Sequence, residues 1–243
     1  MRLLVSVVDE REAVEAVLGG ADIVDVKNPS EGALGAHFPR VIRAVREIVP
    51  REIEVSAAVG DVPYLPGTVS LAALGAAVCG VDYVKIGMYG PRNFEEALVV
   101  SREACRAVKE YDEGVKVVLA GYADYARARC LNPLEIPELA RRVGADVAMI
   151  DTKVKDGKKS LEFVSPVELA EFVEYAHDHG IAVALAGSLE AGDVRVAAEL
   201  GVDIVGFRRA ACGGDRVRGR VSRERVAALK RVLERASSTA PRS

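Results

Sequence analysis

The sequence of 243 residues has no tryptophan, few other aromatic residues and no excess of basic charge. Aromatic residues make up 5% of the chain, and the formal net charge is −3. Proteins that bind nucleic acids need a basic field and, for single strands, aromatic platforms on which bases stack. The composition therefore excludes that class, and we expect no nucleic-acid partner. With 50% hydrophobic and 28% charged residues, the chain is typical of a globular protein.

Cysteine is also scarce, and the four cysteines stand far apart, at Cys79, Cys105, Cys130 and Cys212. Without a CxxC motif, we expect reduced thiols in a cytoplasmic protein, with no disulfide framework. No paired histidines stand at metal-ligand spacing, so we also expect no metal site. The chain opens on the strand-like run Leu3-Leu4-Val5, and no apolar signal segment precedes it, so we expect no secretory leader.

One long segment, Val62 to Val81, carries no charge over 20 residues. It contains prolines and glycines at Pro63, Pro66, Gly67, Gly75 and Gly80. These residues favour a buried helix over a membrane span, so we expect no membrane partner. The part from Thr68 to Gly80 could also contact a second subunit. A barrel helix packed on its own sheet would have the same composition, so a homo-oligomer stays an open alternative.

The strongest pattern is an internal repeat of a glycine, an aspartate and a short β-rich run. Its four copies are Gly20-Ala-Asp-Ile-Val-Asp-Val-Lys27, Gly80-Val-Asp-Tyr-Val-Lys-Ile-Gly87, Gly144-Ala-Asp-Val-Ala-Met-Ile-Asp151 and Gly201-Val-Asp-Ile-Val-Gly-Phe-Arg208. The glycine is typical of a helix end, and the run that follows is typical of a buried strand. Successive glycines lie 60, 64 and 57 residues apart, which fits two strand–helix units per repeat.

Four further strands are expected between the repeats, at residues 3–7, 55–58, 115–119 and 182–186. Helix starts are expected at the capping residues Asp9, Thr68, Asn93, Asn132 and Ser165. Eight strand–helix units in this length predict a single (β/α)8 TIM barrel over residues 1–236, with a disordered tail at 237–243. A doubly wound open sheet is the alternative, but no strand is followed by its GxGxxG fingerprint.

In a (β/α)8 barrel the chemistry lies at the carboxyl ends of the strands. The expected strand ends and the loops after them carry a set of ionisable residues: Asp25, Lys27, Lys85, Asp151, Lys155 and Arg208, with Lys153 close by. A lysine that is buried near another cation has a lowered pKa and becomes a nucleophilic amine. Such an amine forms a Schiff base with a carbonyl, and an aspartate could then move protons.

A structural interpretation competes with this one. Asp25 with Lys27, and Lys85 with Asp151, could be ion pairs that close the barrel, since a charge in an apolar strand needs a partner. For a single lysine we favour the ion pair, and for the whole set at one barrel mouth we favour catalysis. The residues themselves do not say which lysine is the nucleophile.

The loops after the seventh and eighth strands form the usual phosphate site of these barrels. Here they contain small residues and an arginine, namely Gly187, Ser188, Arg208, Gly213 and Gly214. Exposed backbone N–H groups and a guanidinium would suit a phosphate. We therefore predict that these residues bind the phosphate of a small substrate.

Several longer motifs resemble one enzyme family over nearly the whole chain. They are Asp25-Val-Lys27-Asn-Pro-Ser-Glu-Gly-Ala-Leu-Gly35-Ala, Val59-Gly-Asp-Val-Pro63-Tyr, Gly121-Tyr-Ala-Asp124, Lys155-Asp-Gly-Lys158 and Ala210-Ala-Cys212-Gly-Gly-Asp-Arg216. The sequence resembles the (5-formylfuran-3-yl)methyl phosphate synthases, also called 4-(hydroxymethyl)-2-furancarboxaldehyde-phosphate synthases. The resemblance implies a (β/α)8 barrel that makes the furan of methanofuran, a one-carbon carrier, from two molecules of glyceraldehyde 3-phosphate.

The resemblance also assigns roles to residues of this chain. It implies that Lys27 forms the Schiff base, that Lys85 is the general acid/base, and that Asp25, Asp151 and Lys155 belong to the active site. No metal or cofactor is implied. Arg209 departs from the pattern, which commonly has glycine there, and Lys153 is not a position of the family.

Two other functions stay open. A class I aldolase or transaldolase acting on sugar phosphates would share the Schiff base and the phosphate loops but would not release phosphate. A non-catalytic barrel that binds phosphosugars would need no lysine with a lowered pKa.

Overall fold

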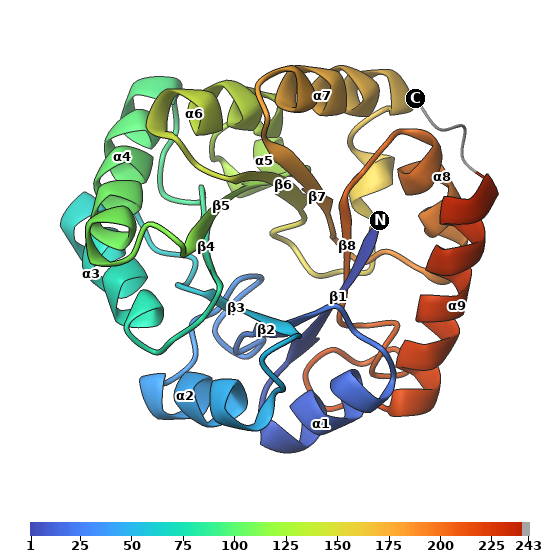
Figure 1. Ribbon diagram of the computed structural model, residues 1–243. Helices are drawn as coiled ribbons and strands as arrows, with labels where there is room; N and C mark the ends of the chain where they lie inside the picture. Colours follow the sequence, from blue (N-terminus) through green and yellow to red (C-terminus); the bar gives the residue numbers. More distant parts are fainter. Residues whose placement is uncertain (240–243) are drawn as a thin grey trace.

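The computed structural model, which describes residues 1–239, is a closed barrel of parallel strands surrounded by helices (Figure 1). Its strands are β1 (Arg2–Val7), β2 (Ile23–Val26), β3 (Glu54–Ala58), β4 (Tyr83–Gly87), β5 (Lys116–Tyr122), β6 (Val147–Asp151), β7 (Ala182–Leu185) and β8 (Ile204–Phe207). They pair in chain order, and β8 pairs with β1 to close the ring. The predicted (β/α)8 barrel is therefore confirmed.

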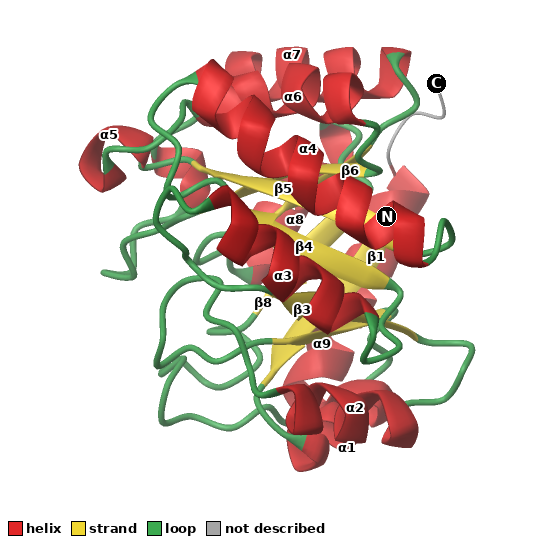
Figure 2. Cartoon of the chain, turned by 90° about the vertical axis from the view of Figure 1, so that its left-hand side faces the viewer, coloured by secondary structure: helices red, strands yellow, loops and turns green. Residues whose placement is uncertain are grey.

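Helices follow the strands and form the outer layer. They are α1 (Glu10–Leu18), α2 (Pro39–Ile48), α3 (Pro66–Ala77), α4 (Phe94–Tyr111), α5 (Tyr125–Ala128), α6 (Ile136–Val143), α7 (Pro166–Asp178), α8 (Val194–Glu199) and α9 (Arg223–Thr239). Short 3-10 turns lie at Pro133–Glu135, Ser160–Glu162 and Ala191–Asp193. Figure 2 shows the longest loops gathered at one end of the barrel. This end carries the carboxyl ends of the strands, where a site is expected.

The repeat seen in the sequence has a common backbone geometry. Its glycines have positive φ angles, +89° at Gly20, +82° at Gly80, +70° at Gly144 and +79° at Gly201. A residue with a side chain is strained there, so glycine stops the helix and turns the chain into the next strand. The repeat therefore marks four of the barrel's helix-to-strand turns.

Most of the predicted helix starts are confirmed. The side chains of Asp9, Asn93, Asn132 and Ser165 each accept a hydrogen bond from a backbone N–H in the first turn. The prediction at Thr68 was wrong, because α3 begins two residues earlier, at Pro66. Proline suits the first turn of a helix, since its fixed φ is helical and its missing N–H would have had no partner there.

The chain packs around two apolar clusters. The larger one lies between the strands and the helices and includes the fully buried Leu3, Val24 and Ile86. The smaller one fills the barrel interior, where Tyr83, Leu34 and Tyr122 are among its largest side chains. Leu34 belongs to the loop after β2 and not to a strand, so a loop at the carboxyl ends of the strands fills part of the barrel interior.

The C-terminal helix is longer than the sequence suggested. We predicted a disordered tail from residue 237, but α9 continues to Thr239, so the prediction was wrong for 237–239. An amphipathic pattern with apolar residues at Val226, Leu229 and Leu233, all buried, holds this helix on the barrel. The rest of the predicted tail, 240–243, lies outside the described residues.

The uncharged segment from Val62 to Val81 forms α3 and the turns around it. Val69, Ala73 and Ala77 are buried on one face of α3, while Leu71 on the outer face is 72% exposed. Among residues 1–239, no helix is long and apolar enough to span a membrane. The expectation of a buried barrel helix is thus met on one face of α3 only.

Candidate active site

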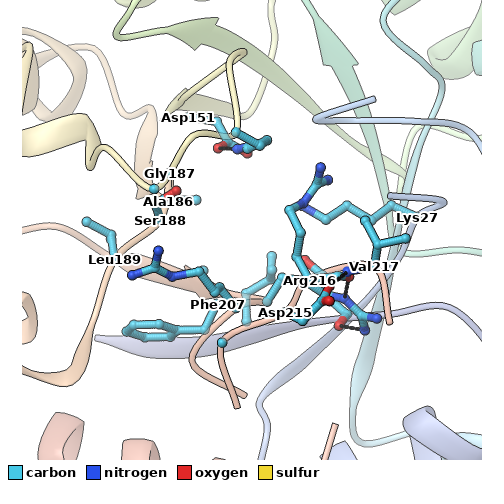
Figure 3. A pocket seen from close by; sticks show the side chains of 18 of the residues that line it. Lys27, Asp151, Ala186, Gly187, Ser188, Leu189, Phe207, Asp215, Arg216 and Val217 are labelled. Carbon is cyan, nitrogen blue, oxygen red and sulfur yellow. Dashed lines mark hydrogen bonds and ion pairs between the residues drawn. The ribbon is translucent and has the colours of Figure 1, made fainter. Parts of the chain in front are cut away.

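A cavity of about 550 Å³ lies at the carboxyl ends of the strands (Figure 3). It is lined by residues of β1, β4, β6 and β8 and by the loops after β2, β6, β7 and β8. Most of the predicted site residues meet here, namely Lys27, Lys85, Asp151, Lys155, Gly187, Ser188, Arg208 and Gly214. Asp25 lies beneath the cavity, and Gly213 is not among the lining residues.

Asp25 and Lys85 form an ion pair inside the barrel. The Lys85 Nζ lies 2.7 Å from Asp25 Oδ2, and both side chains are buried, at 1% and 0% exposure. Register explains the other partners of Asp25, because Ser6 of β1 and Ser56 of β3 are its neighbours across the sheet. Their hydroxyls donate to the carboxylate over 2.8 and 2.9 Å. Asp25 is therefore fully partnered in an otherwise apolar barrel.

Burial by itself would raise the pKa of Asp25. The positive charges of Lys85 and Lys27 outweigh burial, so the pKa of Asp25 lies below its usual value. The carboxyl is thus held ionised, and it holds the Lys85 ammonium in turn. The pair therefore positions the Lys85 amine while Asp25 stays ionised.

Asp151 and Lys155 form a second pair at the end of β6. Lys155 Nζ lies 2.7 Å from Asp151 Oδ1 and 3.0 Å from Thr152 Oγ1. The Thr152 backbone N–H also donates to Asp151 Oδ1, over 2.7 Å. Burial would raise the pKa of Asp151, but Lys155 and Lys27 lower it to about 2. This carboxylate is therefore also ionised at neutral pH.

Lys27 has a different environment from the other two lysines. Its side chain is buried, at 5% exposure, yet its amine makes no hydrogen bond or ion pair with any residue that the structure describes. Burial, assisted by the charges of Lys85 and Lys155, lowers the pKa of Lys27 to about 7, against the opposing effect of Asp151 and Asp25. About half of such amines carry no proton at neutral pH. Lys27 is therefore the lysine best suited to act as a nucleophile.

The ion pairs that we considered from sequence, Asp25 with Lys27 and Lys85 with Asp151, do not form. Lys85 pairs with Asp25 and Lys155 with Asp151. The reason is geometric: two residues advance the chain by roughly 6.6 Å along a strand. Lys27 therefore stands above Asp25, nearer the barrel mouth, whereas Lys85 reaches across from β4.

Arg208 has a structural role that the sequence did not predict. Its guanidinium forms a buried ion pair with Glu12 of α1 and donates to the Ser6 carbonyl and the Arg216 carbonyl, both at 3.0 Å. Arg208 also lines the cavity, so its predicted role in binding phosphate stays a prediction beside this structural role. Glu12 was missed since its position three residues after Asp9 is typical of a helix cap.

Arg216 is the cation of the loop after β8 that remains available. It lines the cavity and donates one hydrogen bond, from Nη2 to the Gly32 carbonyl over 2.8 Å. No carboxylate among residues 1–239 forms an ion pair with it. Burial lowers the pKa of Arg216. Sequence reasoning missed it because this loop contains several arginines and no pattern separates them.

The small residues of the predicted phosphate site divide into two groups. Gly187 and Ser188 have positive φ angles of +98° and +56° and line the cavity, as does Gly214. A Cβ at Gly213 would lie 2.8 Å from the guanidinium of Arg225, so Gly213 packs away from the cavity. Arg209 lines the cavity and forms an ion pair with Glu190 over 2.8 Å.

No group of histidine, cysteine or carboxylate side chains suited to a metal ion is present in the described part of the chain. Three carboxylates line the cavity, and each has partners: Asp151 pairs with Lys155, Asp156 pairs with Arg127, and Asp215 accepts from the backbone N–H groups of Val217 and Arg218. Because these carboxylates are partnered, the polar groups left to meet a substrate are amines, guanidinium groups and backbone amides, which suit an anionic substrate.

Known structures resemble this fold at low sequence identity. The 3-hexulose-6-phosphate synthase of Salmonella typhimurium superposes with a TM-score of 0.66 at 19% identity, covering 99% of this chain and 100% of that one. The orotidine 5'-phosphate decarboxylase of Pyrococcus horikoshii has a TM-score of 0.64 at 18% identity and covers 96% and 99%. These similarities support the barrel fold.

Similarity at the sequence level is much higher. The (5-formylfuran-3-yl)methyl phosphate synthase of Methanocaldococcus jannaschii is 54% identical over 96% of this chain and 100% of its own length. That of Methanopyrus kandleri is 55% identical over 96% and 98%. A family model described as 4-HFC-P synthase matches residues 3–230. By these matches, the chain belongs to the 4-HFC-P synthase family.

Proposed function

We propose that the protein is a Schiff-base-forming carbon–oxygen lyase. It condenses two molecules of glyceraldehyde 3-phosphate to 4-(hydroxymethyl)-2-furancarboxaldehyde phosphate, the furan precursor of methanofuran, with loss of phosphate and water. The observation that carries the proposal is the Lys27 amine, buried at the cavity without a partner among the described residues while Lys85 and Lys155 are paired. The names of the relatives support the same product.

The reaction begins when the Lys27 amine attacks the aldehyde carbon of one triose phosphate and water leaves. The resulting iminium withdraws electrons, so a proton can be removed from the adjacent carbon to give an enamine. Lys85, which lines the cavity and is held by Asp25, serves as the general acid/base. The enamine carbon then attacks the aldehyde of the second triose phosphate and forms the new carbon–carbon bond.

Elimination of phosphate, ring closure and dehydration complete the furan, and hydrolysis of the imine returns the Lys27 amine. The sequence is redox-neutral, so it needs no oxidant. Aromaticity of the product makes the last dehydration effectively irreversible.

Two phosphate groups must be held during the condensation. The retained phosphate is bound by the backbone N–H groups of Gly187 and Ser188, with Arg216 as the cation beside Arg208. The Gly214 N–H donates to the Arg209 carbonyl over 2.9 Å, so Gly214 shapes the loop. The second phosphate, which leaves, faces Lys155 at the edge of β6.

The test is incubation with glyceraldehyde 3-phosphate and borohydride, followed by peptide mass mapping and a parallel assay of released phosphate. We expect a reduced triose adduct on Lys27 together with phosphate release. The variant Lys27→Ala should form no adduct and release no phosphate while keeping its fold by circular dichroism. Lys116→Ala, at the opposite end of the barrel, is the matched control and should retain both signals.

The alternatives give different results in the same assay. An adduct on Lys27 without phosphate release would indicate a class I aldolase or transaldolase. Neither signal, from folded wild-type protein, would indicate a barrel that only binds phosphosugars.

Two further predictions concern the environment of the protein. The four cysteines are free and buried, which supports the proposed reducing, cytoplasmic location. The homo-oligomer stays a prediction: α3 exposes Leu71, and Leu65 and Val78 beside its ends are about half exposed. Light scattering after size exclusion would give the mass of the particle in solution.

A further inference from the structure

One buried carboxylate near the barrel mouth has no part in the mechanism above. Asp61 belongs to the loop after β3, its side chain is 4% exposed, and it does not line the cavity. It accepts hydrogen bonds from the backbone N–H groups of Ala33, at 2.7 Å, and Leu34, at 3.3 Å, and from the Tyr122 hydroxyl. The Lys153 Nζ lies 3.5 Å away. Asp61 therefore joins the loop after β2, the end of β5 and the loop after β6.

The segment that Asp61 holds, Asn28 to Ala36, starts directly after Lys27 and is here called the β2 loop. The loop closes on itself through a hydrogen bond from the Asn28 N–H to the Gly35 carbonyl, 2.8 Å long. Gly32 has a φ of +147°, and a Cβ there would overlap the Asp61 carboxylate. Glycine is thus required for the carboxylate to reach the loop backbone, which explains part of the motif found in the sequence.

The β2 loop packs into the barrel interior beside the cavity. Its Leu34 is fully buried and belongs with Tyr122 to the apolar cluster inside the barrel. No residue of β3, of β5 or of the loops after them lines the cavity, which opens on the side of β6, β7 and β8. In Figure 3, Lys27 and Asp151 lie on different sides of this open space. No residue of the β2 loop lines the cavity either, so the loop packs behind the lining residues, where Arg216 donates to its Gly32 carbonyl, and its first residue directly follows Lys27.

We infer that Asp61 is a positioning residue: it locks the β2 loop in place and thereby keeps the Lys27 amine buried at the cavity. The inference rests on the proposed function, in which Lys27 is the nucleophile. The charged groups that face Lys27 are Asp25, Lys85, Asp151 and Lys155, and none of them belongs to the β2 loop.

Loss of the Asp61 contacts should therefore change the hydration of the Lys27 amine and leave those four charged groups in place. Burial is the largest cause of the low pKa of Lys27. Water that enters beneath a loosened β2 loop would raise the pKa of Lys27 toward the ordinary lysine value. The first unit of rise lowers the free-amine fraction at pH 7 about fivefold, and each further unit about tenfold. Lys153 and Tyr122 give the buried Asp61 carboxylate two further partners besides the loop backbone.

The test is the variant Asp61→Asn, which keeps the shape of the side chain but brings an N–H donor toward backbone donors. Competitive labelling with acetic anhydride over a range of pH, read by peptide mass mapping, measures the pKa of Lys27 without any turnover. We expect that pKa to rise by about one unit or more, turnover at pH 7 to fall about fivefold or more, and turnover to recover as the pH is raised.

Two variants separate positioning from general instability. Asp146→Asn removes a comparable carboxylate at the other end of the barrel, where it accepts from the Val117 N–H over 2.7 Å and pairs with Lys109 over 2.9 Å. It should lower the melting temperature and leave the pKa of Lys27 unchanged. Tyr122→Phe keeps the ring inside the barrel and removes only the hydroxyl, so it serves if Asp61→Asn does not fold, with a smaller shift in the same direction.

An unchanged pKa of Lys27 in both Asp61→Asn and Tyr122→Phe would overturn the inference, whatever their melting temperatures. Borohydride trapping on the wild-type protein tests the proposed function separately. If the wild type traps triose phosphate on Lys27 while the variants keep its pKa, the function stands and the positioning role is overturned. If the wild type traps nothing while Asp61→Asn still raises that pKa, the positioning role is supported and the proposed function fails.

Discussion

Both ends of the barrel interior contain lysines, but the two ends differ in whether each lysine has an ion-pair partner. At the amino end, Glu54 accepts from Arg2 and from Lys116, the latter over 2.9 Å, and Tyr83 takes hydrogen bonds from both cations. At the carboxyl end, Lys27 is buried with no partner among the described residues. Charged residues fill both ends, but in the described chain only the carboxyl end leaves a buried amine unpaired.

The pKa values of the two lysines follow from this difference. Burial lowers the pKa of Lys116, but hydrogen bonds to Glu54 and Tyr83 outweigh burial, so its pKa is raised. Burial of Lys27 is not offset in this way, and its pKa falls to about 7. The comparison shows that a buried lysine has a lowered pKa when its neighbours are paired with one another and not with it.

The largest effect is expected from Lys27→Met, which replaces the unpaired amine with an apolar chain of similar length. Turnover and adduct formation should be lost completely, because the other lysines that line the cavity, Lys85 and Lys155, are paired. The melting temperature should rise, since burial of the Lys27 charge costs on the order of 4 kcal/mol at pH 7. A calorimetric scan and the phosphate-release assay check both parts. A fall in melting temperature would contradict the description of Lys27 as an uncompensated cation.

Lys85→Met should have the opposite effect on stability. It leaves the carboxylate of Asp25 buried without its cation, and breaking a buried pair in this way costs about 3–5 kcal/mol. Urea unfolding would measure the loss. Lys116→Met, at the partly exposed amino end, is the matched control and should cost about 1 kcal/mol or less. Equal losses of unfolding free energy in Lys85→Met and Lys116→Met would show that the ion pairs at the two ends of the barrel contribute equally to stability.

The stability difference between the wild type and Lys27→Met should depend on pH. The pKa of Lys27 is about 7 in the folded protein and near 10.5 when unfolded, so between these values the unfolded chain binds more protons. Wild-type stability from this group therefore rises with pH across that window. Between pH 7 and 9 the advantage of the variant should shrink by about 2–3 kcal/mol, or several degrees in melting temperature. A constant difference over that range would show that the amine is not desolvated.

The smallest effect is expected at the proposed phosphate site. Arg216→Gln removes a cavity cation that has no carboxylate partner in the described chain, so KM for the triose phosphate should rise about tenfold. Arg218→Gln, in the same loop but exposed and outside the cavity, is the control and should leave KM unchanged. If Arg218→Gln raised KM as much as Arg216→Gln, the general charge of the loop would be responsible.

Much of this could be predicted from the sequence. Glycine and aspartate recur at the starts of four strands, and the spacing between them matches strand–helix pairs, so the barrel follows from local propensity and chain length. The ionisable residues that close the apolar runs had to meet at one mouth, because parallel strands all end on the same side. Lys27, Lys85, Asp151 and Lys155 are found there.

Which of these residues pair with one another could be learned only from the folded chain. Lys85 reaches Asp25 from two strands away, and Glu12 of α1 occupies Arg208 at the end of the last strand. Such contacts depend on the register of the barrel and on how far each side chain reaches. The spacing of residues along the chain does not determine either of these. The order of residues was enough to predict a barrel with amines and carboxylates at its mouth. That Lys27 is the amine left unpaired follows from tertiary packing, because ion pairing depends on distances in space and not on order along the chain.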